Sequence, residues 1–353
     1  MNCLFLHCRI GFEKECAAEI TEKASQMEIY GYSKVQDSSA FVLFFTYESD
    51  DALKLIQNLQ FQNLVFVRQW FICNGLQDDL PVNDRLTPLM VAAHLMPPVK
   101  NLVVETPDTN TGKELLVLGN KFSVPFQKTL EKDRLISLAS HWRMHLVFIS
   151  TQQAFLGISP ANNSSPWAMG IPRLRLPKAA PSRATLKLEE AWHHFIPAEK
   201  WDEYLAPGMH AVDLGAAPGG WTWQLVQRSI YVQAIDNGPM DAELMDSGLV
   251  THIKADGFIF EPKRPVDWLV CDIVDKPART SSLISKWFLQ GYCRYAVFNL
   301  KLPMKQRYLE VNLCRDRILS TLKTKNIHVE LNFKQLFHDR EEVTGFIFLK
   351  NKK

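Results

Sequence analysis

A glycine-rich turn follows a short apolar stretch in the middle of the chain, and it is well suited to hold a small ligand. The segment reads Val212-Asp213-Leu214-Gly215-Ala216-Ala217-Pro218-Gly219-Gly220-Trp221-Thr222. Gly215 lets the chain fold sharply over the end of a strand, and Gly219 and Gly220 admit a ligand against bare backbone where a helix begins. A dinucleotide fingerprint has the spacing G-x-G-x-x-G, which this segment lacks. The spacing disfavours a pyrophosphate ligand and leaves other nucleotide cofactors open.

Two acidic residues follow the next two predicted strands, over residues 231–236 and 249–253. Ligands of open parallel sheets bind beyond the carboxyl ends of the strands. Asp236 stands where a carboxylate can accept from the ribose hydroxyls of an adenosine cofactor, and Asp256 where one can accept from an adenine amino group. Both acids also stand in sequences typical of turns, because Asp236 is followed by Asn237-Gly238-Pro239 and Asp256 by Gly257. The preceding glycine turn favours ribose binding for Asp236, whereas both interpretations of Asp256 stay open.

A second group of charged residues marks strand ends of the same predicted sheet. Asp272 ends the apolar run over 266–272, and Lys301 follows the run over 295–300. A lysine at the end of an apolar strand is costly unless it is solvated, paired or used. Glu342 opens the last strand, which a tight reversal makes antiparallel, so its start lies on the same edge. We expect Asp272, Lys301 and Glu342 to converge there, with an ordinary salt bridge as the alternative. Lys187, on a helix over 186–195, is expected at the surface from its position alone.

These motifs resemble those of a known enzyme group. Residues 213–220 resemble the first motif of class I S-adenosylmethionine-dependent methyltransferases, and the order Lys187, Asp272, Lys301, Glu342 is similar to the K-D-K-E tetrad of ribose 2′-O-methyltransferases. The likeness extends along the chain through residues 11–16, 163–166, 169–174 and 298–305. In these segments the sequence resembles the ribosomal RNA large subunit methyltransferase M family.

The resemblance implies transfer of a methyl group from S-adenosylmethionine to the ribose 2′-hydroxyl of a cytidine in 23S ribosomal RNA. It implies that Lys301 is the proton acceptor and that Lys187, Asp272 and Glu342 complete the catalytic set, although a one-residue slip would exchange Glu342 for Glu341. The residues implied to contact the cofactor are Ser182, Ala184, Ala217, Pro218, Gly219, Gly220, Asp236, Asp256 and Asp272. Alanine replaces a serine of the family pattern at 184 and a cysteine at 217, and both replacements are compatible with backbone contacts.

The length of 353 residues predicts two or three domains. Residues 3–72 follow the order β-α-β-β-α-β of a ferredoxin-like fold, and residues 84–160 predict a second α+β unit, which the resemblance identifies as THUMP-type and RNA-binding. Alternating helices and apolar runs after 182 predict an α/β, Rossmann-like sheet, parallel except for its last strand. Five of 19 prolines lie between Ser159 and Ser182. We therefore predict domains at 1–80, 81–160 and 182–353, with a proline-rich basic linker at 161–181.

Charge is unevenly distributed. The net charge is +2, from −3 over residues 1–170 and +5 over residues 171–353. This charge balance argues against a uniformly basic nucleic-acid-binding surface. Any RNA contact would therefore use local basic patches, at 121–143 and 172–187, and the second patch could equally be a solvated linker. Seven cysteines without a C-x-x-C pair predict neither a disulfide framework nor a metal site. With no signal-like start and no long apolar stretch, we expect a soluble, cytoplasmic protein that does not bind a membrane. The resemblance implies ribosomal RNA as its partner, and we expect the protein to be monomeric.

Three other functions are weighed against the sequence, and the two that methylate a base have specific sequence requirements. A C5-cytosine methyltransferase needs a nucleophilic cysteine; Cys271 neighbours the site, but alternation turns it away from Asp272 and it lacks the Pro-Cys context. An amino-methylating enzyme would carry [Asn/Asp]-Pro-Pro-[Tyr/Phe] where this chain has Asp272-Ile273-Val274-Asp275. An RNA-binding assembly factor with a vestigial methyltransferase fold stays possible, although the complete tetrad argues against it.

Overall fold

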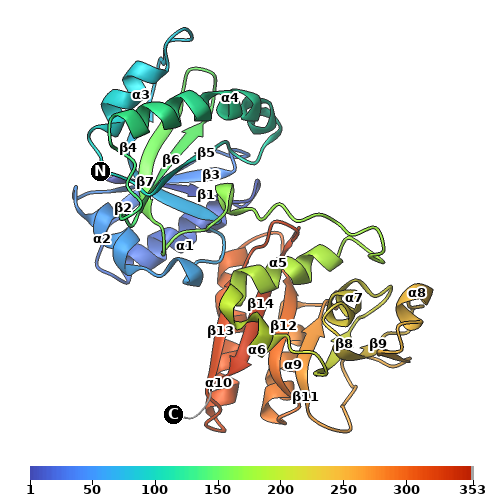
Figure 1. Ribbon diagram of the computed structural model, residues 1–353. Coiled ribbons are helices and arrows are strands. Elements are labelled where there is room, and N and C mark those ends of the chain that lie inside the picture. The colour runs from blue at the N-terminus through green and yellow to red at the C-terminus, as the bar shows by residue number, and fades with distance from the viewer. Residues whose placement is uncertain (351–353) are drawn as a thin grey trace. The chain divides into compact units, whose positions relative to one another are not determined.

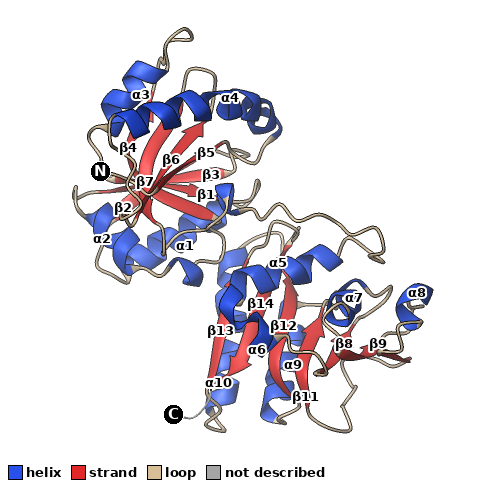
Figure 2. Cartoon of the chain, viewed as in Figure 1, coloured by secondary structure: helices blue, strands red, loops and turns tan. Residues whose placement is uncertain are grey.

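The computed structural model describes residues 1–350, and contacts within the chain divide it into unit 1, Met1–Pro172, and unit 2, which begins at Arg173. Figure 1 shows each unit as a sheet with flanking helices, and Figure 2 separates the helices from the strands. Among the described residues, no helix is long and apolar enough to cross a membrane. The same residues contain no cluster of histidine, cysteine and acidic side chains that could hold a metal ion.

Unit 1 contains one seven-stranded sheet. Its strands are β1 (Cys3–His7), β2 (Gly31–Val35), β3 (Phe41–Thr46), β4 (Gln69–Gln77), β5 (Asn101–Glu105), β6 (Trp142–Phe148) and β7 (Ala154–Pro160). Its helices are α1 (Glu13–Ser25), α2 (Asp51–Asn58), α3 (Leu86–Ala93) and α4 (Asn110–Lys132), with single turns η1 (Phe61–Asn63) and η2 (Ala168–Gly170). The strand order is β2-β3-β1-β4-β7-β6-β5.

The first four strands confirm the ferredoxin-like prediction. The chain order β1-α1-β2-β3-α2-β4 gives the spatial order β2-β3-β1-β4, and the pairs within it are antiparallel. The second α+β region does not form a separate sheet, because β7 pairs with β4 and extends it. The core on one face contains stacked rings of Phe5, Phe41 and Phe71, with centroids 4.8 and 4.9 Å from Phe5.

The first half of the predicted linker is bound to unit 1. Asn163 donates to the carbonyls of Ile56 and Leu59, each at 2.8 Å, and accepts from the Phe61 amide. Gln69 similarly holds the backbone of Ser165. Asparagine and proline are typical of a loop, but the pattern does not reveal that side-chain amides hold this segment against distant backbone.

A buried polar cluster holds the end of this segment. Glu105 accepts from His145 Nδ1 at 2.8 Å and from the Met169 amide, and His145 Nε2 lies 2.8 Å from Ser159 Oγ. This is the connectivity of a Ser-His-Glu triad, but all three side chains are fully buried, so we interpret it as structural. Burial opposes ionisation of Glu105, yet His145 and the other donors hold the pKa of this carboxyl below its usual value.

Unit 2 contains the second seven-stranded sheet. Its strands are β8 (His210–Leu214), β9 (Tyr231–Ile235), β10 (Val250–Ile253), β11 (Val266–Cys271), β12 (Cys293–Lys301), β13 (Val329–Lys334) and β14 (Glu342–Leu349). Its helices are α5 (Thr185–Phe195), α6 (Trp201–Tyr204), α7 (Gly220–Val226), α8 (Ala242–Met245), α9 (Pro277–Leu289) and α10 (Arg307–Lys323), with the turn η3 (Ala198–Lys200).

The topology of unit 2 confirms the Rossmann-like prediction. The order is β10-β9-β8-β11-β12-β14-β13, and the first five strands are parallel. β14 is antiparallel to both neighbours and lies between β12 and β13. Its N-terminal residue therefore reaches the edge at which β11 and β12 end.

An aromatic core fixes α5 on this sheet. Trp268 of β11 is fully buried, with ring centroids 5.0 Å from Tyr295 and 6.4 Å from Trp192 of α5. Leu188 and Ala191 of α5 belong to the same cluster. Since buried aromatic side chains contribute large apolar areas, this packing determines where the first turn of α5 lies.

We expect Glu105→Gln to lower the free energy of unfolding of unit 1 by roughly 1.5–3 kcal/mol near neutral pH, the usual contribution of a hydrogen bond to a charged group. Because the folded-state pKa lies below the ordinary 4.5, the contribution is present above that value and is lost as the pH falls through the folded value. The difference from the unsubstituted protein should therefore shrink in acid. Denaturant-dependent hydrogen exchange of residues 163–171 measures it.

Glu22→Gln is the matched control, because Glu22 is exposed on α1. Equal protection of residues 163–171 in the Glu105→Gln and Glu22→Gln proteins would contradict the assignment of Glu105 as the anchor.

Candidate active site

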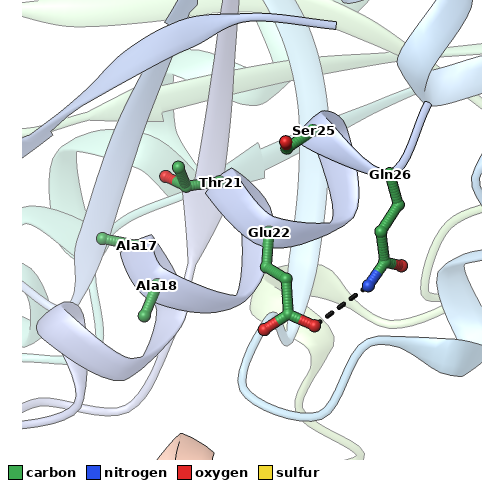
Figure 3. Close-up of a pocket in the computed structure, with 6 residues that line it drawn as sticks. All are labelled: Ala17, Ala18, Thr21, Glu22, Ser25 and Gln26. Carbon is green, nitrogen blue, oxygen red and sulfur yellow. Dashed lines mark hydrogen bonds between the residues drawn. The ribbon is translucent and has the colours of Figure 1, made fainter. Parts of the chain in front are cut away.

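A surface hollow of about 730 Å³ lies over α1 of unit 1 and is lined by one face of that helix. Figure 3 shows its side chains, which are small or polar; Glu22 accepts from Gln26 Nε2 at 3.0 Å. None of the predicted site residues lines this hollow. The predicted residues instead gather at the carboxyl edge of the sheet of unit 2.

The glycine turn between β8 and α7 leaves no space for side chains. Gly219 has φ of 119°, in the left-handed region, and a Cβ there would lie 2.4 Å from Leu244 Cδ2. A Cβ on Gly220 would lie 2.4 Å from Ser182 Oγ and 3.2 Å from Ala184 Cβ. The segment carrying Ser182 and Ala184 therefore packs directly against the turn.

The segment that carries Ser182 also contains a polar atom that lacks a hydrogen-bond partner within the described part of the chain. Ser182 Oγ is buried and has no hydrogen-bond partner among the described residues. A buried hydroxyl without a partner costs free energy, so a polar ligand group beside Gly220 would relieve that cost. This arrangement fits the polar end of a small cofactor.

Asp236 closes the glycine turn from the neighbouring strand. Its carboxylate accepts from the Ala217 amide at 3.0 Å and from the Gly238 amide at 2.7 Å, one oxygen each. A carboxylate has about four acceptor positions, so each oxygen can accept one further donor. Asp256 is exposed and accepts from the Phe258 amide at 2.8 Å, which is the turn geometry that its sequence context also predicted.

Asp213 lies beneath the turn as a buried acid. It accepts from Thr222 Oγ1 at 2.6 Å. Burial raises the pKa of Asp213 to about 7, and the nearby charges of Asp272 and Asp236 act in the same direction. Asp213 is therefore only partly ionised near neutral pH.

The three predicted edge residues and Lys187 form one charged cluster. In the β12–β14 pair Lys301 lies opposite Glu342, and their side chains form an ion pair. The other Glu342 oxygen accepts from Lys187, whose Nζ also lies 3.4 Å from Asp272 Oδ2. Glu342 therefore bridges the two lysines.

The pKa values follow from this pairing. Burial alone would lower the pKa of Lys187, but the charges of Asp272 and Glu342 raise it above the usual lysine value. Burial alone would raise the pKa of Glu342, but Lys187 and Lys301 hold it below the usual glutamate value. Lys187 and Glu342 are therefore both charged at neutral pH.

Two sequence-based expectations are decided by this geometry. Glu342 faces both lysines, whereas Glu341 lies on the opposite face and pairs with Arg307 at 2.5 Å. The surface position expected for Lys187 is wrong, because its side chain is only 14% exposed. It lies in the first turn of α5, which the aromatic core holds next to the start of β14.

The structure adds polar residues that the motifs did not single out. Asn299 donates to Asp272 Oδ1 at 2.7 Å, and Thr344 lies 2.8 Å from Asn299. Asn299 is two residues before Lys301, so strand alternation could have placed both on one face. Glu190 of α5 accepts from the amides of Phe337 and His338 and so holds the β13–β14 loop. No local signal predicts that long-range contact.

Comparison with known protein families matches three stretches of the chain. Residues 1–71 match the RlmM ferredoxin-like domain, residues 84–160 match ribosomal RNA large subunit methyltransferase M, N-terminal, and residues 180–337 match the FtsJ-like methyltransferase. The order of the matches follows the two sheets, with the first two in unit 1 and the third in unit 2.

Curated proteins match over nearly the whole chain. Ribosomal RNA large subunit methyltransferase M of Cellvibrio japonicus is 66% identical over 98% of this chain and 99% of its own length. The proteins of the same name from Pseudomonas putida (strain GB-1) and Edwardsiella ictaluri are 54% and 52% identical, each over 98% of this chain and over 97% and 93% of their own lengths. The chain belongs to the ribosomal RNA large subunit methyltransferase M family.

Proposed function

We propose that the protein transfers the methyl group of S-adenosylmethionine to the ribose 2′-hydroxyl of a cytidine in 23S ribosomal RNA. The observation that carries this proposal is the Glu342 carboxylate between Lys187 and Lys301, at the same sheet edge as a glycine turn that excludes side chains. The names of the relatives support ribosomal RNA as the substrate. Cytidine and the 2′-hydroxyl come from the family resemblance and the tetrad.

The domain boundaries at 80, 160 and 181 belong to the same proposal. Residues 1–80 and 81–160 would position the RNA, and residues 182–353 would carry the reaction. The basic residues at 172–187 support a phosphate contact next to the catalytic unit.

S-adenosylmethionine, when bound, supplies a methyl group on a cationic sulfur. The turn at Ala217, Pro218, Gly219 and Gly220 would hold it against backbone, with the Ser182–Ala184 segment beside its methionine end. Asp236 would accept from the ribose hydroxyls with its remaining lone pairs, and Asp256 from the adenine amino group. Asp272 would lie between this cofactor region and the lysines.

Lys301 is the better placed of the two lysines to accept the proton of the 2′-hydroxyl. Lys187 pairs with two carboxylates, whereas Lys301 pairs within the described structure with Glu342, a carboxylate that Lys187 already shares. Lys301 is also the more exposed, 28% against 14%, so substrate can reach it.

The base-methylating alternatives have less support. Burial raises the pKa of the Cys271 thiol to about 12, so it is not the thiolate that a C5-cytosine methyltransferase requires. Residues 272–275 lack the two prolines of an amino-methylating motif. A vestigial RNA-binding factor would have no need for the shared carboxylate, whose burial is costly unless it is paired.

We expect the protein to transfer labelled methyl groups from S-adenosylmethionine to 23S ribosomal RNA isolated from a strain that lacks this gene. Digestion to nucleosides should yield label in 2′-O-methylcytidine, because the proposed base acts on a ribose hydroxyl. Label in a base-methylated nucleoside would overturn the proposal, and cofactor binding without any transfer would support the assembly factor.

Lys301→Ala should lower kcat by at least roughly 100-fold, the lower range for loss of a general base. Binding of S-adenosylmethionine should stay close to that of the unsubstituted protein, because Lys301 lies on the substrate side. The control is Lys305→Ala, which removes an exposed positive charge four residues away. Full methyl transfer by the Lys301→Ala protein would show that another group is the base.

Asp236→Ala should raise the Kd for S-adenosylmethionine roughly 10- to 100-fold, as loss of charge-assisted hydrogen bonds costs about 1.5–3 kcal/mol. Isothermal titration calorimetry with the cofactor measures this change. Asp246→Ala removes an exposed acid at the end of α8 and is the matched control. An unchanged Kd in the Asp236→Ala protein would remove Asp236 from the cofactor site.

A further inference from the structure

We propose that Asp339, Thr344 and Asn299 form a one-directional hydrogen-bond chain that orients the Asp272 carboxylate for methyl transfer. Asp339 would thus be a positioning residue for the reaction, acting through two other side chains. The inference rests on the proposed function, since it gives these residues a part in that reaction.

The contacts form an unbroken series. Asn299 Nδ2 lies 2.7 Å from Asp272 Oδ1, and Asn299 Oδ1 lies 2.8 Å from Thr344 Oγ1. Thr344 Oγ1 lies 3.1 Å from each carboxyl oxygen of Asp339. Asn299, Thr344 and Asp339 are fully buried, and Asn299 and Thr344 are opposite each other in the β12–β14 pair. Solvent therefore cannot take the place of these three side chains.

The chemistry of the two ends fixes the direction. Asp272 faces the ammonium group of Lys187, so its carboxylate can only accept. Asn299 must therefore turn its amide nitrogen to Asp272 and its oxygen to Thr344. That oxygen needs a donor, and the single hydroxyl proton of Thr344 supplies it. The Thr344 oxygen is then left as an acceptor, and Asp339 can satisfy it only by carrying a proton.

The surroundings of Asp339 favour the neutral acid. Burial raises its pKa well above the usual aspartate value, and the charges of Glu342 and Glu190 add to this effect. Lys187 opposes it but is engaged by its two carboxylate partners. The Leu336 amide donates to Asp339 Oδ2 at 2.9 Å, which leaves Oδ1 to carry the proton toward Thr344. If Asp339 were ionised, the lone pairs of its carboxylate would face those of the Thr344 oxygen with no proton between them.

This hydrogen-bond chain would affect the charged cluster through the orientation of Asp272. With Oδ1 held by Asn299, Asp272 presents Oδ2 to Lys187, and Lys187 in turn reaches Glu342. If the chain breaks, Asp272 can rotate and the lysines lose their fixed spacing. A displacement of about 1 Å in such a site can cost on the order of 100-fold in rate.

The test compares substitutions that keep or remove the donors. Thr344→Val keeps the shape but removes the hydroxyl, and kcat should fall roughly 10- to 100-fold while KM for ribosomal RNA is unchanged. Thr344→Ser restores a hydroxyl and should recover most of the kcat. Asp339→Asn should also retain most of it, because its amide can donate to Thr344 and accept from Leu336, whereas Asp339→Leu should behave like Thr344→Val.

Ser285→Ala is the control for loss of a buried hydroxyl. Ser285 is buried in α9 and donates to the Ser281 carbonyl at 2.8 Å. Ser285→Ala should leave kcat unchanged, and the unfolding temperatures of this variant and of Thr344→Val are measured alongside. The comparison separates loss of stability from loss of positioning.

The outcomes distinguish this inference from the proposed function. If the unsubstituted protein methylates ribosomal RNA and Lys301→Ala does not, yet folded Thr344→Val keeps full kcat, the positioning chain is wrong and the function stands. Equal loss of kcat in Thr344→Ser and Thr344→Val would also overturn the chain. Absence of methyl transfer by the unsubstituted protein would overturn the proposed function itself.

Discussion

The shared carboxylate of Glu342 is the interaction on which the site depends. Lys187 and Lys301 both contact the carboxylate of Glu342, and two ammonium groups held that close repel each other unless an anion lies between them. Glu342 is only 3% exposed, and each of its oxygens accepts from one lysine. Removing it would leave two partly buried cations facing each other. The backbone must therefore deliver this side chain to one place.

Three features of unit 2 bring the Glu342 side chain and its partners together. β14 runs antiparallel between β12 and β13, which brings its first residue to the edge where the parallel strands end. Trp192 and Trp268 hold α5 on the sheet, so Lys187 comes from a separate element to the same point. Glu190, also on α5, binds the loop before β14. One helix thus supplies both a charged residue of the cluster and the anchor for the strand that carries its partner.

The sequence predicted the elements of this edge better than their pairing. Asp272 and Lys301 end apolar runs, so their convergence followed from strand direction, and the family resemblance is confirmed by the relatives. The sequence could not decide between Glu341 and Glu342, because a one-residue shift of the strand register exchanges the faces on which their side chains lie. Lys187 looked exposed, since its partners are far away in the chain. No motif singled out Asp339; its burial, which raises its pKa, and its contact with Thr344 are visible only in the folded chain.

The protonation states explain how so many acids share one edge. Lys187 and Lys301 balance Asp272 and Glu342, so the cluster is neutral only if Asp339 keeps its proton. Under the proposed function, a cationic sulfonium enters beside this neutral cluster and adds one positive charge. An ionised Asp339 would compensate that added charge, whereas a neutral Asp339 would leave it uncompensated. Under the two proposals, burial of a neutral Asp339 would thus leave the charge of the cofactor available to the proton transfer that the reaction requires.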